Sequence, residues 1–365
     1  MLLLELVTRD YLQIYYAVLI AFFIVVFVLI NTTQNKQRVL EVSYVFTVLF
    51  LLFSSFLWGL RPVHIGADTL GYMYKYVEYC QYQSIDELPI DLSSDIFFMF
   101  TQYLFSRYFS YTIFFLFISV FIHFSVYKVV ALFVKKDKVY DIQIYFIFLF
   151  CALFSFPSLH SNILRNGLGV SFLLISLGYW YNSRILYSIF FGVMAVFFHK
   201  TTLIPIAILV FLSNVNIRRN ILIVLYFMSA LISFLKLGIN NLPFIQSTEY
   251  DRARLYLDAT VNYYRTGFRV DFFLFNTMFL LIFLFFRVRD KRLNILLNYY
   301  LIASSLFFLW FQIPFSDRIG LYSWLAIPII FFYSMCHNFN RNKSLIVGGG
   351  VLMFIVVNSI IVLKN

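Results

Sequence analysis

The sequence predicts an all-α integral membrane protein, and two features of its composition lead to this fold class. Of its 365 residues, 62% are hydrophobic and only 12% are charged, whereas a soluble domain has about 25% charged residues. The hydrophobic residues also gather in runs long enough for membrane-spanning helices, each of which needs about 20 mostly apolar residues. Because no stretch is polar enough to form a soluble domain, we predict one polytopic membrane domain over residues 1–365.

The apolar runs predict about 12 transmembrane helices. They lie near residues 11–30, 42–60, 111–134, 142–158, 163–181, 185–199, 202–213, 221–238, 272–287, 293–312, 321–336 and 344–363. The run 202–213 is short and must extend into its flanking residues to span the membrane. The segment 95–108 is too short and too polar to span, so we interpret it as an amphipathic helix lying in the membrane interface.

The orientation of the spans follows from the positions of Lys and Arg, because short loops rich in these residues stay in the cytoplasm. The short basic segments are 31–41, 135–141, 182–184, 214–220, 287–292 and 337–343. If these segments are cytoplasmic, both chain ends lie on the outer side. The same side then carries two longer loops, about 61–95 and about 239–271.

The charge and the cysteines exclude several classes of function. The formal net charge is +11, but the basic residues are scattered through short loops and form no stripe, which argues against nucleic acid as a partner. Cys80, Cys151 and Cys336 are expected in different compartments, so we predict neither a disulfide nor a metal site. The sequence has no nucleotide-binding motif and no metal-ligand spacing, so we expect no cofactor.

A few basic residues lie against this orientation, on the side predicted to face away from the cytoplasm. They are Arg61, Arg165, Arg318 and the pair His199–Lys200, each at the edge of an apolar run. Basic residues are scarce on that side of a membrane protein. Their presence there indicates an anionic ligand bound at the outer face of the membrane.

The first group of candidate residues directly follows the second predicted span. Its sequence is Arg61-Pro-Val-His-Ile-Gly-Ala-Asp-Thr-Leu-Gly-Tyr, residues 61–72. The proline and the glycines prevent simple continuation of the helix. Arg61 then supplies a cation near the membrane surface and Asp68 a carboxylate a few residues later. A solvated loop containing an ion pair is the alternative interpretation.

Two further candidates lie at the edges of later spans. Arg165 falls within the first turns of the apolar run 163–181, where a charge is costly unless it is paired or faces a wet cavity. Snorkelling of the side chain to the surface is the alternative. His199 lies in the tight turn 197–205 and could be a base, a hydrogen-bond donor or a phosphate contact. A purely structural histidine is the alternative there.

The remaining candidates lie in the last third of the chain. Asp317 and Arg318 are adjacent in the short turn 314–320, where they could also simply neutralise each other. The loop 248–271 mixes aromatic residues with arginines, among them Tyr264, Arg265 and Arg269. Such a mixture suits sugar faces and phosphates, although a solvated amphipathic segment would have a similar composition.

The order of these residues resembles the EpsG-like branch of the bacterial O-antigen, capsule and exopolysaccharide polymerases, often called Wzy. The resemblance covers residues from about 42 to 335 and rests on Arg61, Asp68 and Tyr72, then Arg165 opening a helix, His199 before a Thr-x-x-x-Pro turn, and Asp317-Arg318. It implies a bacterial inner-membrane glycosyltransferase with a GT-C-like architecture, active at the periplasmic face without a metal. Such an enzyme transfers a growing glycan from undecaprenyl diphosphate to the non-reducing end of a lipid-linked repeat unit.

The resemblance also implies partners and roles for the candidate residues. The partners are the undecaprenyl-diphosphate-linked donor and acceptor, membrane lipid and a chain-length regulator. Arg61, Arg165 and Arg318 would bind the donor diphosphate, since an arginine forms a bidentate fork with phosphate. The supporting or glycan-binding residues would be Tyr72, Tyr264, Arg265, Arg269 and Asp317.

The proton of the acceptor hydroxyl needs a general base. Asp68 is our first choice for this base and His199 our second. Direct displacement with a single base predicts inversion at the anomeric carbon, whereas a second carboxylate acting as nucleophile would give retention.

Two other functions use the same lipid-linked sugars. An O-antigen ligase has the same donor but the lipid A core as its acceptor, and it usually has one dominant outer loop instead of two moderate ones. A lipid-linked oligosaccharide flippase should line a central cavity with charges deep in several helices. The candidate charges here cluster at one face, which favours the polymerase.

Overall fold

Helices form the regular structure of the computed structural model, which describes residues 2–90, 95–237, 265–286, 290–339 and 343–364. Within these ranges there is no strand, so the all-α prediction is confirmed. The described residues form two compact units. The first unit comprises Met1–Leu203 and Asn342–Asn365, and the second unit comprises Ile204–Arg341. The single polytopic domain stays a prediction.

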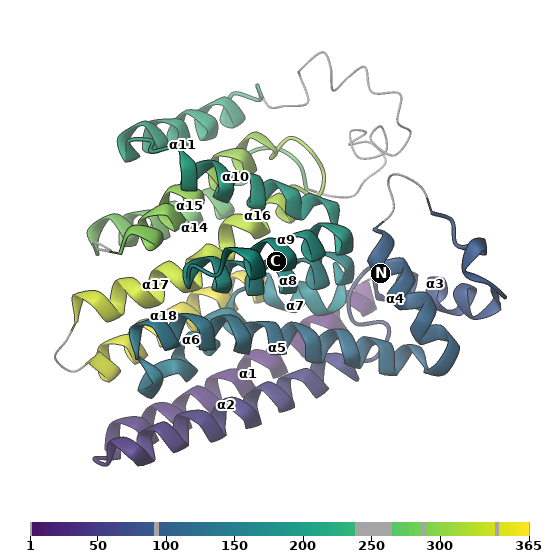
Figure 1. Ribbon diagram of the computed structural model, residues 1–365, viewed down its shortest axis with the longest axis horizontal. Helices are drawn as coiled ribbons and strands as arrows, with labels where there is room; N and C mark the ends of the chain where they lie inside the picture. Colours follow the sequence, from purple (N-terminus) through teal and green to yellow (C-terminus); the bar gives the residue numbers. More distant parts are fainter. Residues whose placement is uncertain (1, 91–94, 238–264, 287–289, 340–342, 365) are drawn as a thin grey trace. The chain divides into compact units, whose positions relative to one another are not determined.

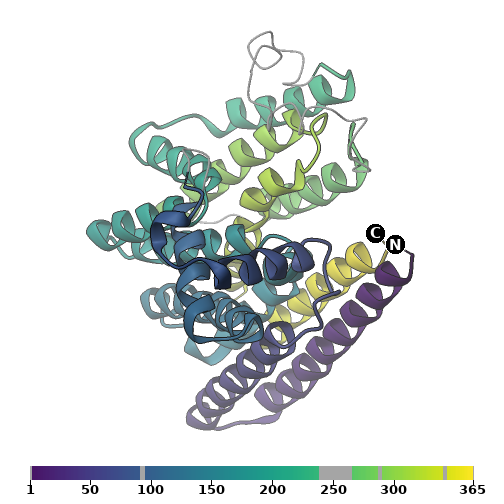
Figure 2. The same ribbon diagram turned by 90° about the vertical axis from the view of Figure 1, so that its right-hand side faces the viewer.

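The first unit contains ten α-helices among its described residues (Figure 1). They are α1 (Leu2–Thr32), α2 (Lys36–Gly59), α3 (Thr69–Gln81), α4 (Ile96–Tyr108), α5 (Tyr111–Asp137), α6 (Gln143–Ala152), α7 (Phe156–Ser161), α8 (Leu164–Tyr181), α9 (Ile185–Phe198) and α18 (Lys343–Lys364), with the 3₁₀ turns η1 (Ile85–Glu87), η2 (Tyr140–Ile142) and η3 (Lys200–Thr202). Helix α1 packs against α2 (Figure 1) and against α18 (Figure 2). Helix α5 packs against α2 and α8, and α8 packs against α9.

The second unit is built from shorter helices around a buried asparagine. Its described helices are α10 (Leu203–Asn214), α11 (Arg219–Phe234), α14 (Val270–Phe285), α15 (Lys291–Leu309), α16 (Asp317–Trp324) and α17 (Ala326–Asn338). The indole N–H of Trp324 on α16 donates to the side-chain oxygen of Asn276 on α14 at 2.9 Å. The side-chain amide of Asn276 donates to Ser304 Oγ on α15 at 3.2 Å. These bonds join three helices where no water would satisfy the same groups.

Local sequence signals explain where several helices begin. The side chain of Asn35 accepts hydrogen bonds from two backbone N–H groups in the first turn of α2, and that of Ser110 accepts one from the backbone N–H of Ile113 in α5. Asp290 caps α15. These residues satisfy backbone donors that would otherwise have no partner at a helix start.

Six helical segments in the described residues are long and apolar enough to cross a membrane. They are Thr8–Thr32, Lys36–Gly59, Tyr111–Asp137, Lys291–Leu309, Asp317–Asn338 and Lys343–Leu363. The other predicted spans also fall on helices, but these are shorter or less apolar. The helical content of the predicted spans is therefore confirmed, whereas their total of about 12 stays a prediction.

Two features differ from the sequence-based expectation. The predicted span 142–158 is broken between α6 and α7, because Pro157 in a continuous helix would clash with the carbonyl of Leu153. The predicted outer loop 61–95 contains the helix α3, which packs on α4. The side chain of Gln102 on α4 donates to the carbonyl of Tyr72 at 3.0 Å and helps hold the two helices together. The segment 95–108 is helical as predicted; its interfacial location stays a prediction.

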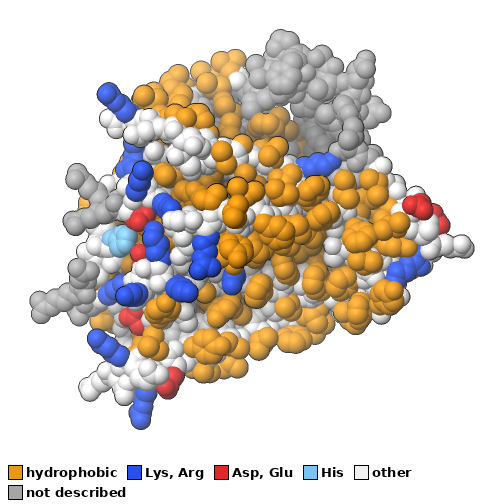
Figure 3. All heavy atoms as spheres, viewed as in Figure 1, with side chains coloured by type: hydrophobic (Ala, Val, Ile, Leu, Met, Phe, Trp, Pro, Cys, Tyr) orange, Lys and Arg blue, Asp and Glu red, His pale blue; other side chains and the backbone are white. Residues whose placement is uncertain are grey.

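The short basic segments of the first unit lie at one end of its helices. The Tyr181 hydroxyl at the end of α8 donates to Asp137 at the end of α5, at 2.9 Å. The Asn182 side chain donates to the carbonyl of Leu132 at 2.9 Å. Along α5 and its neighbours, hydrophobic side chains cover much of the visible face, with Lys and Arg gathered toward one end (Figure 3). Arg165 and His199 lie at the opposite helix ends, at the start of α8 and the end of α9.

The Asn276 bonds give a prediction for stability. Replacing Asn276 with Ala leaves the indole N–H of Trp324 and the hydroxyl of Ser304 without this partner. The free energy of unfolding should therefore fall by about 1–2 kcal/mol. Thermal unfolding of the detergent-solubilised protein measures the effect. Asn214→Ala is the matched control, because Asn214 is exposed and its side chain donates to the Val210 carbonyl of its own helix. Equal melting temperatures for the two variants would contradict the role of Asn276.

Candidate functional site

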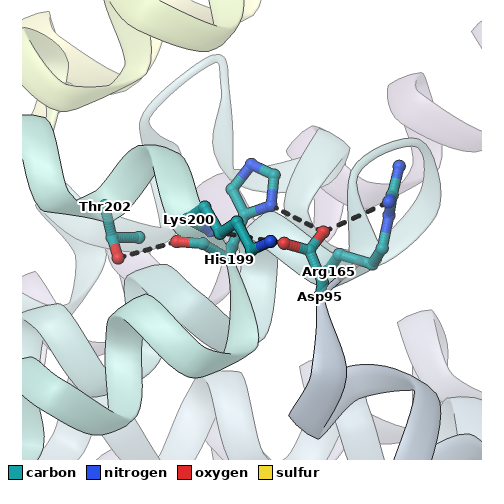
Figure 4. Close-up of polar contacts among 5 residues, drawn as sticks. All are labelled: Asp95, Arg165, His199, Lys200 and Thr202. Atoms are coloured by element: carbon teal, nitrogen blue, oxygen red, sulfur yellow. Dashed lines mark hydrogen bonds and ion pairs between the residues drawn. The ribbon is translucent and has the colours of Figure 1, made fainter. Parts of the chain in front are cut away.

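The carboxylate of Asp95 organises the polar contacts at one end of the first unit (Figure 4). Arg165 Nη1 donates to Asp95 Oδ2 at 3.1 Å, and His199 Nδ1 lies 3.1 Å from the same oxygen. The backbone N–H of Lys200 donates to Asp95 Oδ1 at 3.3 Å. Asp95 precedes α4, Arg165 is in the first turn of α8 and His199 follows α9, so three helices meet here. We call these four residues the Asp95 cluster.

Asp95 is ionised although it is largely enclosed. Its side chain is 6% exposed, and burial by itself raises the pKa of the carboxyl. The hydrogen bond and charge of His199, followed by the charge of Arg165, outweigh this effect and hold the pKa of Asp95 below its usual value. The carboxylate therefore accepts hydrogen bonds and donates none at neutral pH, so the proton in the contact with His199 lies on Nδ1.

The turn that carries His199 is fixed by close packing against α8. The Thr202 hydroxyl donates to the His199 carbonyl at 2.8 Å, and Figure 4 shows this bond beside the cluster. Gly169 of α8 lies against the turn. A Cβ on this residue would be 2.8 Å from His199 Cβ and 3.0 Å from Thr202 Cγ2. The glycine is therefore what lets α8 approach the turn.

Aromatic contacts align α4 with the end of α9. The ring of Phe97 stacks on Phe197 with centroids 4.7 Å apart and meets Phe198 edge-on at 5.8 Å. Such pairs each contribute about 0.5–1.5 kcal/mol beyond their buried area. Since Phe97 lies two residues after Asp95 and Phe198 directly precedes His199, this packing brings the carboxylate to the imidazole.

Arg61 is buried and anchors the segment 61–69. Its Nη1 donates to the Trp58 carbonyl at 2.8 Å and its Nη2 donates to Thr69 Oγ1 at 3.2 Å. Its guanidinium also lies 5.1 Å from the centre of the Phe115 ring. Burial lowers the pKa of Arg61 to about 10, so the side chain is still charged at neutral pH. Both terminal nitrogens of its guanidinium thus bind protein groups.

The segment 61–69 packs against the residues that connect α7 to α8. The Thr69 hydroxyl donates to the Ser161 carbonyl, with 3.0 Å between the oxygens. Gly66 has a φ of +94°, and a Cβ there would lie 2.7 Å from the side-chain oxygen of Asn162. The structure thus places the first predicted group next to the segment that leads into Arg165.

Asp68 and Tyr72 lie at the start of α3. Asp68 is exposed at the first turn. The ring of Tyr72 meets Phe98 of α4 edge-on, with centroids 5.7 Å apart. Tyr72 therefore joins α3 to the same helix that Asp95 precedes.

The second unit has a charged group of its own. Arg269 forms two hydrogen bonds with Asp271, at 3.1 and 2.7 Å. The charges of Arg318 and Arg269 both act on Asp317, and the Arg318 guanidinium lies 4.5 Å from the centre of the Phe315 ring. The predicted residues Arg269, Asp317 and Arg318 are thus close together. Arg265 is exposed nearby in the chain, and Tyr264 lies outside the described residues.

Two buried histidines lie in the same unit as the Asp95 cluster but outside it. His123 on α5 is hydrogen-bonded, with Ser119 O at 2.8 Å and Ser54 Oγ at 2.7 Å. His160 on α7 lies with its ring 4.7 Å from that of His123. Burial, followed by the charges of His123 and Arg61, lowers the pKa of His160 well below its usual value, so its ring is neutral near pH 7.

Asp95 is not among the site residues that the sequence predicts. By its position in the sequence it only begins the predicted amphipathic segment 95–108. One indirect signal was present: Arg165 in an apolar run requires a partner or a wet cavity, and the structure supplies a partner. Within the described part of the chain, no three His, Cys, Asp or Glu side chains gather as metal ligands would.

The close packing at Gly169 gives a second prediction. In Gly169→Ala the added methyl group must displace the His199 turn, and such overpacking costs about 1–3 kcal/mol. Gly71→Ala is the matched control, because nothing lies within 4 Å of a Cβ at Gly71 and Ala favours the helix α3. In thermal unfolding in detergent, Gly169→Ala should have a lower melting temperature than the wild type, and Gly71→Ala should not. An unchanged melting temperature for Gly169→Ala would contradict the claim that close packing at Gly169 fixes the His199 turn.

Comparison with known proteins places these features in a family. Neither the curated proteins nor the solved structures gave a match to the chain. The EpsG family, in contrast, matches residues 43–365, a range that contains the Asp95 cluster and all of the predicted site residues. EpsG is a Wzy-like polymerase family. Since the match covers most of the sequence, the chain belongs to the EpsG family.

Proposed function

We propose that this member of the EpsG family polymerises lipid-linked repeat units at the outer face of a bacterial inner membrane. The family suggests a polysaccharide polymerase in general. Our proposal adds a donor, an undecaprenyl-diphosphate-linked glycan, and an acceptor, the non-reducing end of a second lipid-linked unit. The observation that carries it is the Asp95 cluster, which holds Arg165 and His199 together at one end of the first unit.

The distribution of charge in the first unit supports an outward-facing site. The basic ends of α5 and α8 lie together, and the Asp95 cluster lies at the other ends of α8 and α9. Because short Lys- and Arg-rich segments stay in the cytoplasm, the Asp95 cluster would face the periplasm. A substrate that arrives there on a lipid is already activated, so the protein needs no nucleotide-binding site.

Arg165 is the best-placed ligand for the donor diphosphate. Its side chain is 42% exposed, while its Nη1 is hydrogen-bonded to Asp95. A guanidinium has five N–H donors, and the exposed part of this side chain can meet phosphate oxygens. The N-terminus of α8 adds a partial positive charge beside it. Its role would be to neutralise the negative charge that develops on the leaving diphosphate.

The other predicted residues keep supporting roles in this proposal. Arg61 is buried, so it acts by holding the segment 61–69 and meets phosphate only if that segment opens. Arg318 is the second proposed phosphate ligand. Tyr72, Asp317, Arg265, Arg269 and Tyr264 would border the path of the glycan. Transfer with one base and direct displacement would invert the anomeric carbon, and Asp68 and His199 are the candidate bases.

Replacing Arg165 tests the proposal. Arg165→Ala should slow chain extension by about 10²–10³, the usual effect of losing one electrostatic contact to a transition state. The measurement is the length distribution of surface polysaccharide in the native host, with membrane abundance checked. Arg165→Lys keeps the positive charge but cannot form two parallel hydrogen bonds to a phosphate, so we expect partial activity.

Arg107→Ala serves as the matched control, since Arg107 lies in the last turn of α4 against Tyr103 and outside the Asp95 cluster. Stable Arg165→Ala protein that leaves only single repeat units supports a polymerase. An unchanged ladder would remove Arg165 from the site. Loss of even the single-unit product would indicate a ligase or a flippase instead.

A further inference from the structure

Asp95 contacts only one of the two ring nitrogens of His199. Nδ1 lies 3.1 Å from Asp95 Oδ2, and the other ring nitrogen points away from the carboxylate (Figure 4). An ionised carboxylate accepts hydrogen bonds and cannot donate one, so Nδ1 carries the hydrogen. In a neutral imidazole, Nε2 is then the nitrogen with a lone pair to accept a proton. The His199 side chain is 15% exposed, so a ligand can reach it.

We infer that Asp95 is a positioning residue for a general base, His199, whose Nε2 takes the proton of the acceptor hydroxyl. This inference rests on the proposed function and chooses between its two candidate bases. Asp95 itself does not touch the substrate. Its carboxylate selects the tautomer of the imidazole and fixes the direction of Nε2.

The transfer step balances with these groups. The acceptor hydroxyl gives its proton to His199 Nε2 as its oxygen forms a bond to the anomeric carbon of the donor. The bond from that carbon to the diphosphate oxygen breaks, and its electron pair leaves with the diphosphate. Arg165 offsets the negative charge that develops there. The imidazolium that results is stabilised by Asp95, and it later releases its proton to water.

The sharing of one oxygen by His199 and Arg165 makes the arrangement specific. Both side chains bind Asp95 Oδ2, and the Lys200 backbone N–H holds Oδ1. The base and the phosphate-binding cation are therefore held at a fixed separation by a single carboxylate. Asp95 contacts the imidazole directly, and Arg165 binds the same carboxylate oxygen.

His199 meets the geometric requirement for a base better than Asp68 does. A general base must be held within hydrogen-bond reach of the proton that it removes. His199 is fixed by Asp95, by the Thr202 bond to its carbonyl and by the tight contact at Gly169. Asp68 is exposed at the start of α3 and lies outside the Asp95 cluster.

The test uses the purified full-length protein in lipid nanodiscs with undecaprenyl-diphosphate-linked repeat units. The initial rate of glycan extension, measured at a series of acceptor concentrations, gives kcat and KM. His199→Ala should lower kcat by about 10²–10⁴, the usual contribution of a general base, and added imidazole should restore part of it. Imidazole should not restore Asp68→Asn. His199→Asn keeps a donor to Asp95 without a base, so it should be folded and equally slow.

Asp95→Asn tests the positioning role. The amide can donate to Nδ1 and so favour the tautomer with hydrogen on Nε2, which cannot accept a proton. We expect kcat to fall by about 10² or more, within the range for loss of a general base, with KM changed less than threefold. The matched control is Asp137→Asn, because Asp137 also accepts a hydrogen bond, from Tyr181, at the other end of the first unit.

The outcomes separate the inference from the proposed function. If the wild-type protein extends no glycan, the proposed function fails and the inference fails with it. If the wild type extends glycans and His199→Asn or Asp95→Asn does so at the wild-type kcat, the inference alone is overturned. Failure of imidazole to restore any activity to folded His199→Ala would also overturn it.

Discussion

The pairing of one enclosed carboxylate with two cationic partners is the interaction on which the arrangement at this end of the first unit depends. Asp95 is almost fully shielded from solvent, and a charge in such a place is costly unless it is paired and hydrogen-bonded. Arg165 has the same need, because it lies at the start of an apolar helix. Each charge thus offsets the energetic cost of placing the other in an apolar environment. Together with His199, the two groups join α4, α8 and the end of α9.

This pairing is possible because the backbone comes unusually close at a few positions. Gly169 lets α8 reach the turn after α9, and Gly66 lets the segment 61–69 reach the residues before α8. The stacked rings of Phe97 and Phe197 hold α4 against α9. Interiors packed this tightly transmit small shifts, so residues that never meet a substrate still determine where His199 and Arg165 lie.

Arg61 and Arg165, the two predicted phosphate ligands of the first unit, differ in their surroundings. Arg61 uses its guanidinium on a carbonyl, a hydroxyl and an aromatic ring, which makes it an anchor for the segment that carries Asp68. Arg165 uses one nitrogen on Asp95 and exposes much of the rest. Both arginines looked equivalent in the sequence, since each lies at the edge of an apolar run. Their different surroundings distinguish a buried anchoring residue from one whose side chain is partly exposed.

The sequence by itself determined the helical fold class and the positions of most helices, and it marked Arg165 and His199 as candidates, because apolar runs and misplaced charges are local properties of a chain. It did not determine the break at Pro157 within an apolar run or the helix α3, whose stability comes from packing on α4. Only the tertiary structure decided that Asp95 joins Arg165 and His199, since the partners are 70 and 104 residues apart. Sequence periodicity and spacing cannot predict which of several carboxylates will pair with a given cation over such sequence separations. The packing of α4, α8 and α9 decides this pairing.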